Sequence, residues 1–132
     1  PMRLDRACAN AQTLAEFCDE HTKVNHTYYP GLPDHPQHDR ANQLFANFGA
    51  IFSIDLTDEI DCFDFLNNMD IVIASSNLGD TRTLAIPVAH TIYYEMGTER
   101  RASMGIDDSM IRFSVGVEDI EDLLEDFQKA LN

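Results

Sequence analysis

One arginine stands where it could hold an anion. Residues 110–117 alternate between apolar and polar side chains, which predicts a strand with Ile111 and Phe113 on its apolar face and Arg112 on the opposite face. A guanidinium group can bind a carboxylate through two parallel hydrogen bonds, so Arg112 is a candidate carboxylate ligand. The alternative is an ordinary exposed arginine that pairs with one of the many acidic side chains of the chain.

A second candidate is the polar segment 74–84, which follows the apolar stretch 70–75 and contains Ser76 and Asn77. Loops of this composition bring hydroxyl and amide groups to ligands. The same residues would also suit a simple connection, in which Asn, Gly and Asp serve only the turn. The sequence alone leaves both interpretations open.

The other reactive residue types carry weaker signals. His35 and His38 flank a proline that stiffens the pair, and no ligand spacing typical of a metal site surrounds them, so we expect a loop followed by a helix. His90 lies near no nucleophile in a recognised context, and we expect it to cap or pack. The three cysteines have no CxxC spacing, which predicts free thiols, mostly packed as small hydrophobic residues.

Composition excludes several classes of protein. The 132 residues are enough for one domain with one core, and their formal net charge of -14 would repel nucleic acid and anionic lipid surfaces. No apolar run approaches the roughly 18 residues of a membrane span, and the first residues lack the apolar region of a signal peptide. We therefore expect a cytoplasmic protein that binds neither nucleic acid nor membranes. The acidic run 118–126 is read as a solvated helix face.

The elements that position these residues follow from periodicity. Apolar residues at helical spacing predict helices over 4–18, 37–45, 58–68 (capped by Thr57 or Asp58), 89–104 in two pieces, and 118–131. Alternating or β-branched stretches predict strands over 24–29, 49–56, 70–75, 84–87 and 110–117. This order favours an α+β fold, with a mostly antiparallel sheet and helices packed on one face.

Six stretches, read in order, resemble the last third of the Cys/Met metabolism enzymes, which include cystathionine synthases and lyases, methionine γ-lyase and homoserine-ester sulfhydrylases. They are Asn10-Ala11 with Leu14-Ala15, Tyr29-Pro30-Gly31-Leu32 with His35-Pro36 and His38, Phe48-Gly49 leading to Ser53, Leu78-Gly79-Asp80-Thr81-Arg82-Thr83-Leu84 with Pro87, Gly105-Ile106-Asp107, and Ile111-Arg112-Phe113-Ser114-Val115-Gly116-Val117-Glu118-Asp119. Each stretch is weak alone, but their colinear order across nearly the whole chain is specific.

The resemblance implies three substrate-binding residues. The arginine of the I-R-x-S-V-G motif, Arg112 here, holds the substrate α-carboxylate in the family. The residue before Leu-Gly helps it and is Asn77 here, where serine is usual in the lyases and synthases. Asn77 together with Asp80 and Arg82 is closer to the sulfhydrylase-like branch. Ser76 resembles a position that lines the pocket for the distal side chain.

The resemblance also implies a parent enzyme that depends on pyridoxal 5'-phosphate (PLP), acts on sulfur amino acids or homoserine esters and assembles as a homo-oligomer, a tetramer. Residues 1–132 would be its single C-terminal substrate-binding domain, without the upstream PLP-binding domain. Neither Lys23 nor Lys129 lies in a motif like that of the family's cofactor lysine. We therefore expect this chain to bind no cofactor, to contain no catalytic residue and to be inactive alone. The alternatives are a stand-alone module that binds or senses a small molecule and an assembly domain.

Overall fold

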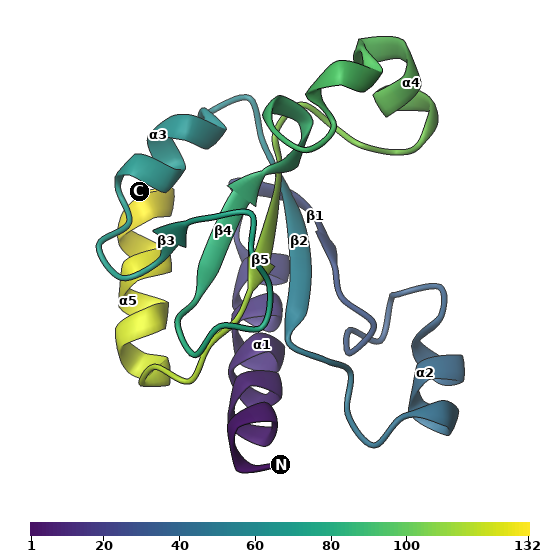
Figure 1. The fold of residues 1–132 in the computed structure, drawn as a ribbon, viewed down its shortest axis with the longest axis vertical. Helices are drawn as coiled ribbons and strands as arrows, with labels where there is room; N and C mark the ends of the chain where they lie inside the picture. Colours follow the sequence, from purple (N-terminus) through teal and green to yellow (C-terminus); the bar gives the residue numbers. More distant parts are fainter.

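A five-stranded sheet forms the centre of the molecule, and the computed structural model describes all residues, 1–132 (Figure 1). The strands are β1 (Val24–Tyr28), β2 (Ile51–Leu56), β3 (Ile73–Ala74), β4 (Leu84–Pro87) and β5 (Met110–Ser114). Their order across the sheet is β1-β2-β5-β4-β3, and only the β3–β4 pair is parallel. The predicted α+β class with a mostly antiparallel sheet is confirmed.

Two long helices cover one face of this sheet. The helices are α1 (Met2–Glu20), α2 (His38–Leu44), α3 (Cys62–Asn67), α4 (Thr98–Ser103) and α5 (Ile120–Leu131), with short 3₁₀ helices η1 (Val88–His90) and η2 (Tyr94–Met96). The apolar stripe of α1 includes Leu14, and that of α5 includes Phe127; both residues are fully buried. Phe127 packs against Phe113 of β5 with ring centroids 4.9 Å apart, so α5 closes the core from the side that the sequence predicted.

The opposite face of the sheet is where Arg112 lies. Arg112 is paired in register with Ser53 of β2 and Ile86 of β4, and Ser53 is paired with Tyr28 of β1. Residues directly opposite one another in neighbouring strands project from the same face. The predicted phase of β5 is therefore confirmed: Ile111 and Phe113 are fully buried against the helices, while Arg112 is half-buried on the other side.

The predicted strand over 70–75 is shorter and more exposed than expected. Only Ile73–Ala74 forms a strand, and both residues are exposed. The reason is the buried carboxylate of Asp126 in α5, which accepts hydrogen bonds from the backbone N–H groups of Asp70 (2.7 Å), Ile71 (3.0 Å) and Val72 (3.1 Å). Those N–H groups are consumed by a side chain and are not available to a strand ladder.

Three helix starts also differ from the prediction. Helix α3 begins at Cys62, because Asp61 caps it by accepting hydrogen bonds from two backbone N–H groups. Helix α5 begins at Ile120 with Asp119 as its cap, so Glu118 lies before the helix and not within it. Within the stretch 89–104, predicted as two helical pieces, α4 begins only at Thr98, directly after Gly97 with φ 81°. None of the helices is long and apolar enough to cross a membrane.

Candidate functional site

Arg112 in β5 has no acidic partner. The ion pairs of the chain are Arg82 with Asp80, Arg101 with Asp108, and Lys129 with Asp70. The guanidinium of Arg112 donates through Nη2 to the backbone carbonyl of Ser76 at 3.0 Å, and its buried Nε has no hydrogen-bond partner. The interpretation of Arg112 as an arginine paired with an acid is therefore wrong. Most donors of its fork remain available to an anion.

The segment after β3 is held against β5 beside this arginine. The Ser76 carbonyl accepts the Arg112 hydrogen bond, and three residues later the Gly79 N–H donates to Ser114 Oγ at 2.9 Å. Ser114 is the second residue after Arg112 in the same strand, so one strand anchors both ends of the turn. Ser76 thus contacts Arg112 directly, and Asn77 is the next residue of the same turn; their binding of a substrate stays a prediction.

Within this turn, the side chains of Ser76 and Asn77, which the sequence indicated as candidate ligand-binding groups, make no hydrogen bond with the rest of the chain. Ser76 contacts Arg112 through its backbone carbonyl, and its hydroxyl makes no hydrogen bond within the chain. The Asn77 N–H donates to Ser75 Oγ at 3.2 Å, while its exposed amide side chain makes no hydrogen bond. The Asn77 amide is therefore free to contact a ligand.

Asp80 and Arg82, by contrast, serve the turn itself. Asp80 accepts from the Arg82 backbone N–H at 2.9 Å, from Arg82 Nε at 3.1 Å and from Arg82 Nη2 at 3.1 Å. The hydrogen bonds from the Arg82 side chain, followed by those from its backbone, hold the pKa of the Asp80 carboxyl well below its usual range. Arg82 therefore has its own counter-ion and does not act as a second anion ligand beside Arg112.

A carboxylate that the sequence did not single out fixes the far end of the segment. Glu118 accepts from the Thr83 N–H (Oε2, 2.7 Å) and the Thr83 hydroxyl (Oε1, 2.7 Å), and Thr83 is completely buried. The same hydroxyl accepts from the Gly116 N–H at 3.0 Å. We call these three residues the Thr83–Glu118 latch. The sequence signal was the presence of Thr83 and Glu118 in the colinear motifs, but the acidic run that contains Glu118 was interpreted as a solvated helix face.

The close approach of the two chain segments explains Gly116. A Cβ atom at this position would lie 2.2 Å from the Thr81 carbonyl oxygen and 2.5 Å from the Arg82 carbonyl carbon. No side chain can be accommodated without moving that backbone. The strand after Arg112 and the segment after Asn77 are therefore packed backbone to backbone.

A groove of about 460 Å³ lies next to the turn. Its lining includes Ser75 and Ser76 from the turn, Ile86 and Pro87 of β4, and Ile92 beyond η1. Ile86 is the register partner of Arg112, so the groove and the guanidinium share one region of the sheet. An apolar wall with an anion ligand at its side fits a small molecule that carries both a carboxylate and an apolar part.

The histidines and cysteines take structural roles. His38 Nδ1 lies 2.7 Å from the Pro30 carbonyl oxygen, with its ring stacked on Phe48. His90 Nε2 lies 2.9 Å from the Asp108 carbonyl oxygen, so the expectation that His90 caps or packs is confirmed. Cys8, Cys18 and Cys62 are all free and buried, as predicted, and burial raises the pKa of each thiol.

Comparisons with known proteins identify relatives of this chain. The family model of the Cys/Met metabolism PLP-dependent enzymes matches residues 1–132. An O-succinylhomoserine sulfhydrylase of Mycobacterium tuberculosis is 37% identical over 136 residues, which cover 99% of this chain and 34% of the relative. A cystathionine beta-lyase of Lactococcus lactis is 40% identical over 130 residues, which cover 98% of this chain and 34% of the relative.

Solved structures share the fold as well. The cystathionine gamma-lyase of Lactobacillus plantarum complexed with L-serine matches with a TM-score of 0.93 and 30% identity, over 98% of this chain and 34% of that chain. The cystathionine gamma synthase of Xanthomonas oryzae in complex with cystathionine matches with a TM-score of 0.92 and 35% identity, over the same shares of the two chains. This chain thus spans 34% of the length of these relatives. It belongs to the family of the Cys/Met metabolism PLP-dependent enzymes.

Proposed function

We propose that the chain is the C-terminal substrate-binding domain of a PLP-dependent enzyme that eliminates or replaces a group at the β or γ carbon of sulfur amino acids or homoserine esters. Arg112 holds the α-carboxylate of the substrate, Asn77 assists it, and Ser76 lines the pocket for the distal part. The observation that carries this proposal is the Arg112 guanidinium, which has a buried Nε without a partner in a chain with 23 acidic residues. A buried donor left without an acceptor is costly, and a substrate carboxylate would satisfy it.

In our proposal, the cofactor is bound by a part of the protein outside this chain. PLP supplies the electron sink of the reaction and is bound through a lysine in enzymes that use it. Lys23 Nζ donates to the Asn132 carbonyl at 3.2 Å, and Lys129 Nζ is paired with Asp70. Neither amine lies beside Arg112 or Ser76, so the residues present do not fit the cofactor, and we assign none of them to it. The chain alone should have no activity.

The remaining parts of the proposal concern the setting of the enzyme. We propose a cytoplasmic homo-oligomer, a tetramer, in which this domain contacts an upstream PLP-binding domain. Exposed apolar side chains such as Leu44, Phe45 and Ile92 are consistent with burial against other parts of an assembly. Sizing of the complete enzyme by light scattering would test the oligomeric state.

The decisive experiment is a kinetic comparison in the complete enzyme. Replacing Arg112 by Ala removes two charge-assisted hydrogen bonds to the carboxylate, each worth about 1.5–3 kcal/mol. We expect kcat/KM to fall by roughly 100-fold or more, and Arg112→Lys to recover only part of the loss because an ammonium cannot form the two-bond fork. Arg40→Ala is the matched control, since Arg40 is exposed in α2 and its side chain makes no hydrogen bond or ion pair in the chain.

A substrate analogue makes the test specific to the carboxylate. The wild-type enzyme should prefer an amino acid to its α-carboxamide, and Arg112→Ala should lose most of that preference. An unchanged kcat/KM, or a loss that is equal for the acid and the amide, would remove the assigned role of Arg112.

A further inference from the structure

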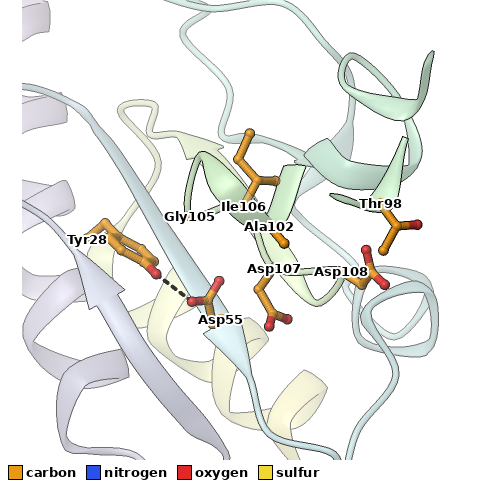
Figure 2. Close-up of a pocket in the computed structure, with 8 residues that line it drawn as sticks. All are labelled: Tyr28, Asp55, Thr98, Ala102, Gly105, Ile106, Asp107 and Asp108. Carbon is orange, nitrogen blue, oxygen red and sulfur yellow. Dashed lines mark hydrogen bonds between the residues drawn. The ribbon is translucent and has the colours of Figure 1, made fainter. Parts of the chain in front are cut away.

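A second hollow, drawn in Figure 2, is lined by Tyr28 and Asp55, which lie on the same face of the sheet as Arg112. Its volume is about 370 Å³, and it lies between Tyr28 and Asp55 of the sheet and the segment from Thr98 to Asp108. Three of its lining side chains are carboxylates, Asp55, Asp107 and Asp108, and none is a lysine, arginine or histidine. The hollow is therefore an acidic cavity without a cation of its own lining.

Asp55 gives the clearest sign of a missing partner. Its side chain lies in the hollow and the residue is only 8% exposed. Oδ2 accepts a 2.6 Å hydrogen bond from the Tyr28 hydroxyl, as Figure 2 shows, but Oδ1 is buried and has no hydrogen-bond partner. Burial, with a further contribution from the negative charge of Asp107, raises the pKa of the Asp55 carboxyl. A positively charged hydrogen-bond donor would pair with Oδ1 and would offset the repulsion between the Asp55 and Asp107 carboxylates.

The two other carboxylates are also only partly used. Asp107 Oδ1 accepts from the backbone N–H of Ser109 at 2.8 Å and from its hydroxyl at 2.6 Å. Asp108 Oδ1 lies 3.6 Å from Arg101 Nη2. Each of the three carboxylates therefore uses one oxygen for contacts within the chain and leaves the other without such a contact.

The spacing of these groups argues against a metal ion. No three His, Cys, Asp or Glu side chains lie close enough together to hold one. A nitrogen donor reaches its acceptors across longer distances than a metal ion does. A guanidinium binds best when one carboxylate presents both oxygens, which none of the three can do here. An ammonium group has three separately directed N–H donors and suits single oxygens on different side chains.

We propose that this hollow binds the ammonium group of an alkylamine, which contacts Asp55 Oδ1 and the unused oxygen of Asp107. The ammonium comes either from a free small amine or from a lysine side chain of the remainder of the protein. Arg112 does not line this hollow. The site itself does not rest on the function proposed above, whereas a lysine source rests on the proposal that this chain is one domain of a larger protein.

The first arm of the test uses the chain and n-butylammonium chloride. We expect saturable changes in the backbone NMR signals of Asp55 and Asp107 as butylammonium is added. Asp55→Asn should lower the affinity for butylammonium about fivefold or more. Asp58→Asn, an exposed aspartate beyond the end of β2, is the matched control and should bind as the wild type does. Butyltrimethylammonium has the same charge but no N–H donors; equal binding of this ion, or equal binding by Asp55→Asn, would overturn the proposal.

The second arm separates the two sources of the ammonium. Carbodiimide treatment of the complete protein joins a carboxylate to an amine in direct contact, and mass spectrometry locates the bond. A link from Asp55 or Asp107 to a lysine identifies a side-chain ligand. Saturable binding of butylammonium without such a link identifies a free amine. If neither binding nor a link is found, the site does not exist.

Discussion

Removal of the Glu118 carboxylate is the sharpest test of how the anion-binding turn is held. In Glu118→Ala, the N–H and hydroxyl of the completely buried Thr83 lose acceptors at 2.7 Å. Each buried donor left unpaired costs about 1–3 kcal/mol, so the loss of both acceptors should lower the free energy of unfolding by about 2–6 kcal/mol. This is a large share of the roughly 5–15 kcal/mol typical of a domain.

The loss is measurable by urea unfolding followed by circular dichroism, which suits a chain without tryptophan. With a typical slope of about 2 kcal/mol per molar urea, the midpoint should fall by about 1–3 M. Glu118→Gln keeps one acceptor oxygen and should lose about half as much. Glu125→Ala, an exposed glutamate in α5, is the control and should change the midpoint little.

A local measurement shows whether the turn itself is released. Arg82 is exposed between Asn77 and Thr83, so trypsin can report on the mobility of this segment. Cleavage after Arg82 should be faster in Glu118→Ala than in Glu125→Ala when both are in folding conditions. If the midpoint and the cleavage rate of Glu118→Ala both match those of Glu125→Ala, water replaces the carboxylate and the latch does not hold the turn.

Three further outcomes are expected. Gly116→Ala should displace the Thr81–Arg82 backbone and, in the complete enzyme, lower kcat/KM while Arg112 is intact; unaltered kinetics would contradict the close packing. Asp126→Ala should lower the free energy of unfolding by about 3 kcal/mol or more, because three backbone N–H groups lose their acceptor. Thermal unfolding measures this loss, and the control Asp122→Ala should unfold near the wild-type temperature. Burial raises the pKa of Asp55 above its ordinary value of 3.8, so the folded state binds a proton more tightly than the unfolded state does. The free energy of unfolding therefore falls as the pH rises from 3.8 through the pKa of the folded state. Asp55→Asn should therefore be more stable than wild type at pH 7 in urea titrations, with the difference disappearing below about pH 3.8; no gain at pH 7 would contradict this reasoning.

The elements that the sequence predicted well are those whose apolar residues repeat with one period. Helices α1 and α5 and strands β2 and β5 follow such patterns, and the phase of β5 alone placed Arg112 on the face opposite the core. The resemblance to the Cys/Met metabolism enzymes added Ser76 and Asn77, and in the structure the Ser76 carbonyl contacts Arg112. Periodicity and motifs thus located the candidate site.

The features that were missed depend on contacts between distant parts of the chain. The Asp126 carboxylate, more than 50 residues away in the sequence, binds the N–H groups of residues 70–72 and so prevents most of the stretch 70–75 from forming a strand. No local sequence pattern predicts this contact. Glu118 meets Thr83 across 35 residues, and Ser76 meets Arg112 across 36. In the last case the sequence named the right residue, but the atom in contact is a backbone carbonyl, which a side-chain argument does not predict.

The strand order has a consequence for how the chain acquires its structure. β5 lies between β2 and β4, yet it is the last strand in the sequence. Until residues 110–114 have left the ribosome, β2 and β4 each present an edge without a partner, and the pairing of β5 closes loops of more than 50 and more than 20 residues. Such late, non-local closure slows folding and leaves apolar edges exposed to other chains. The strand that carries Arg112 is therefore also the one whose arrival completes the sheet, so the site cannot form before the fold does.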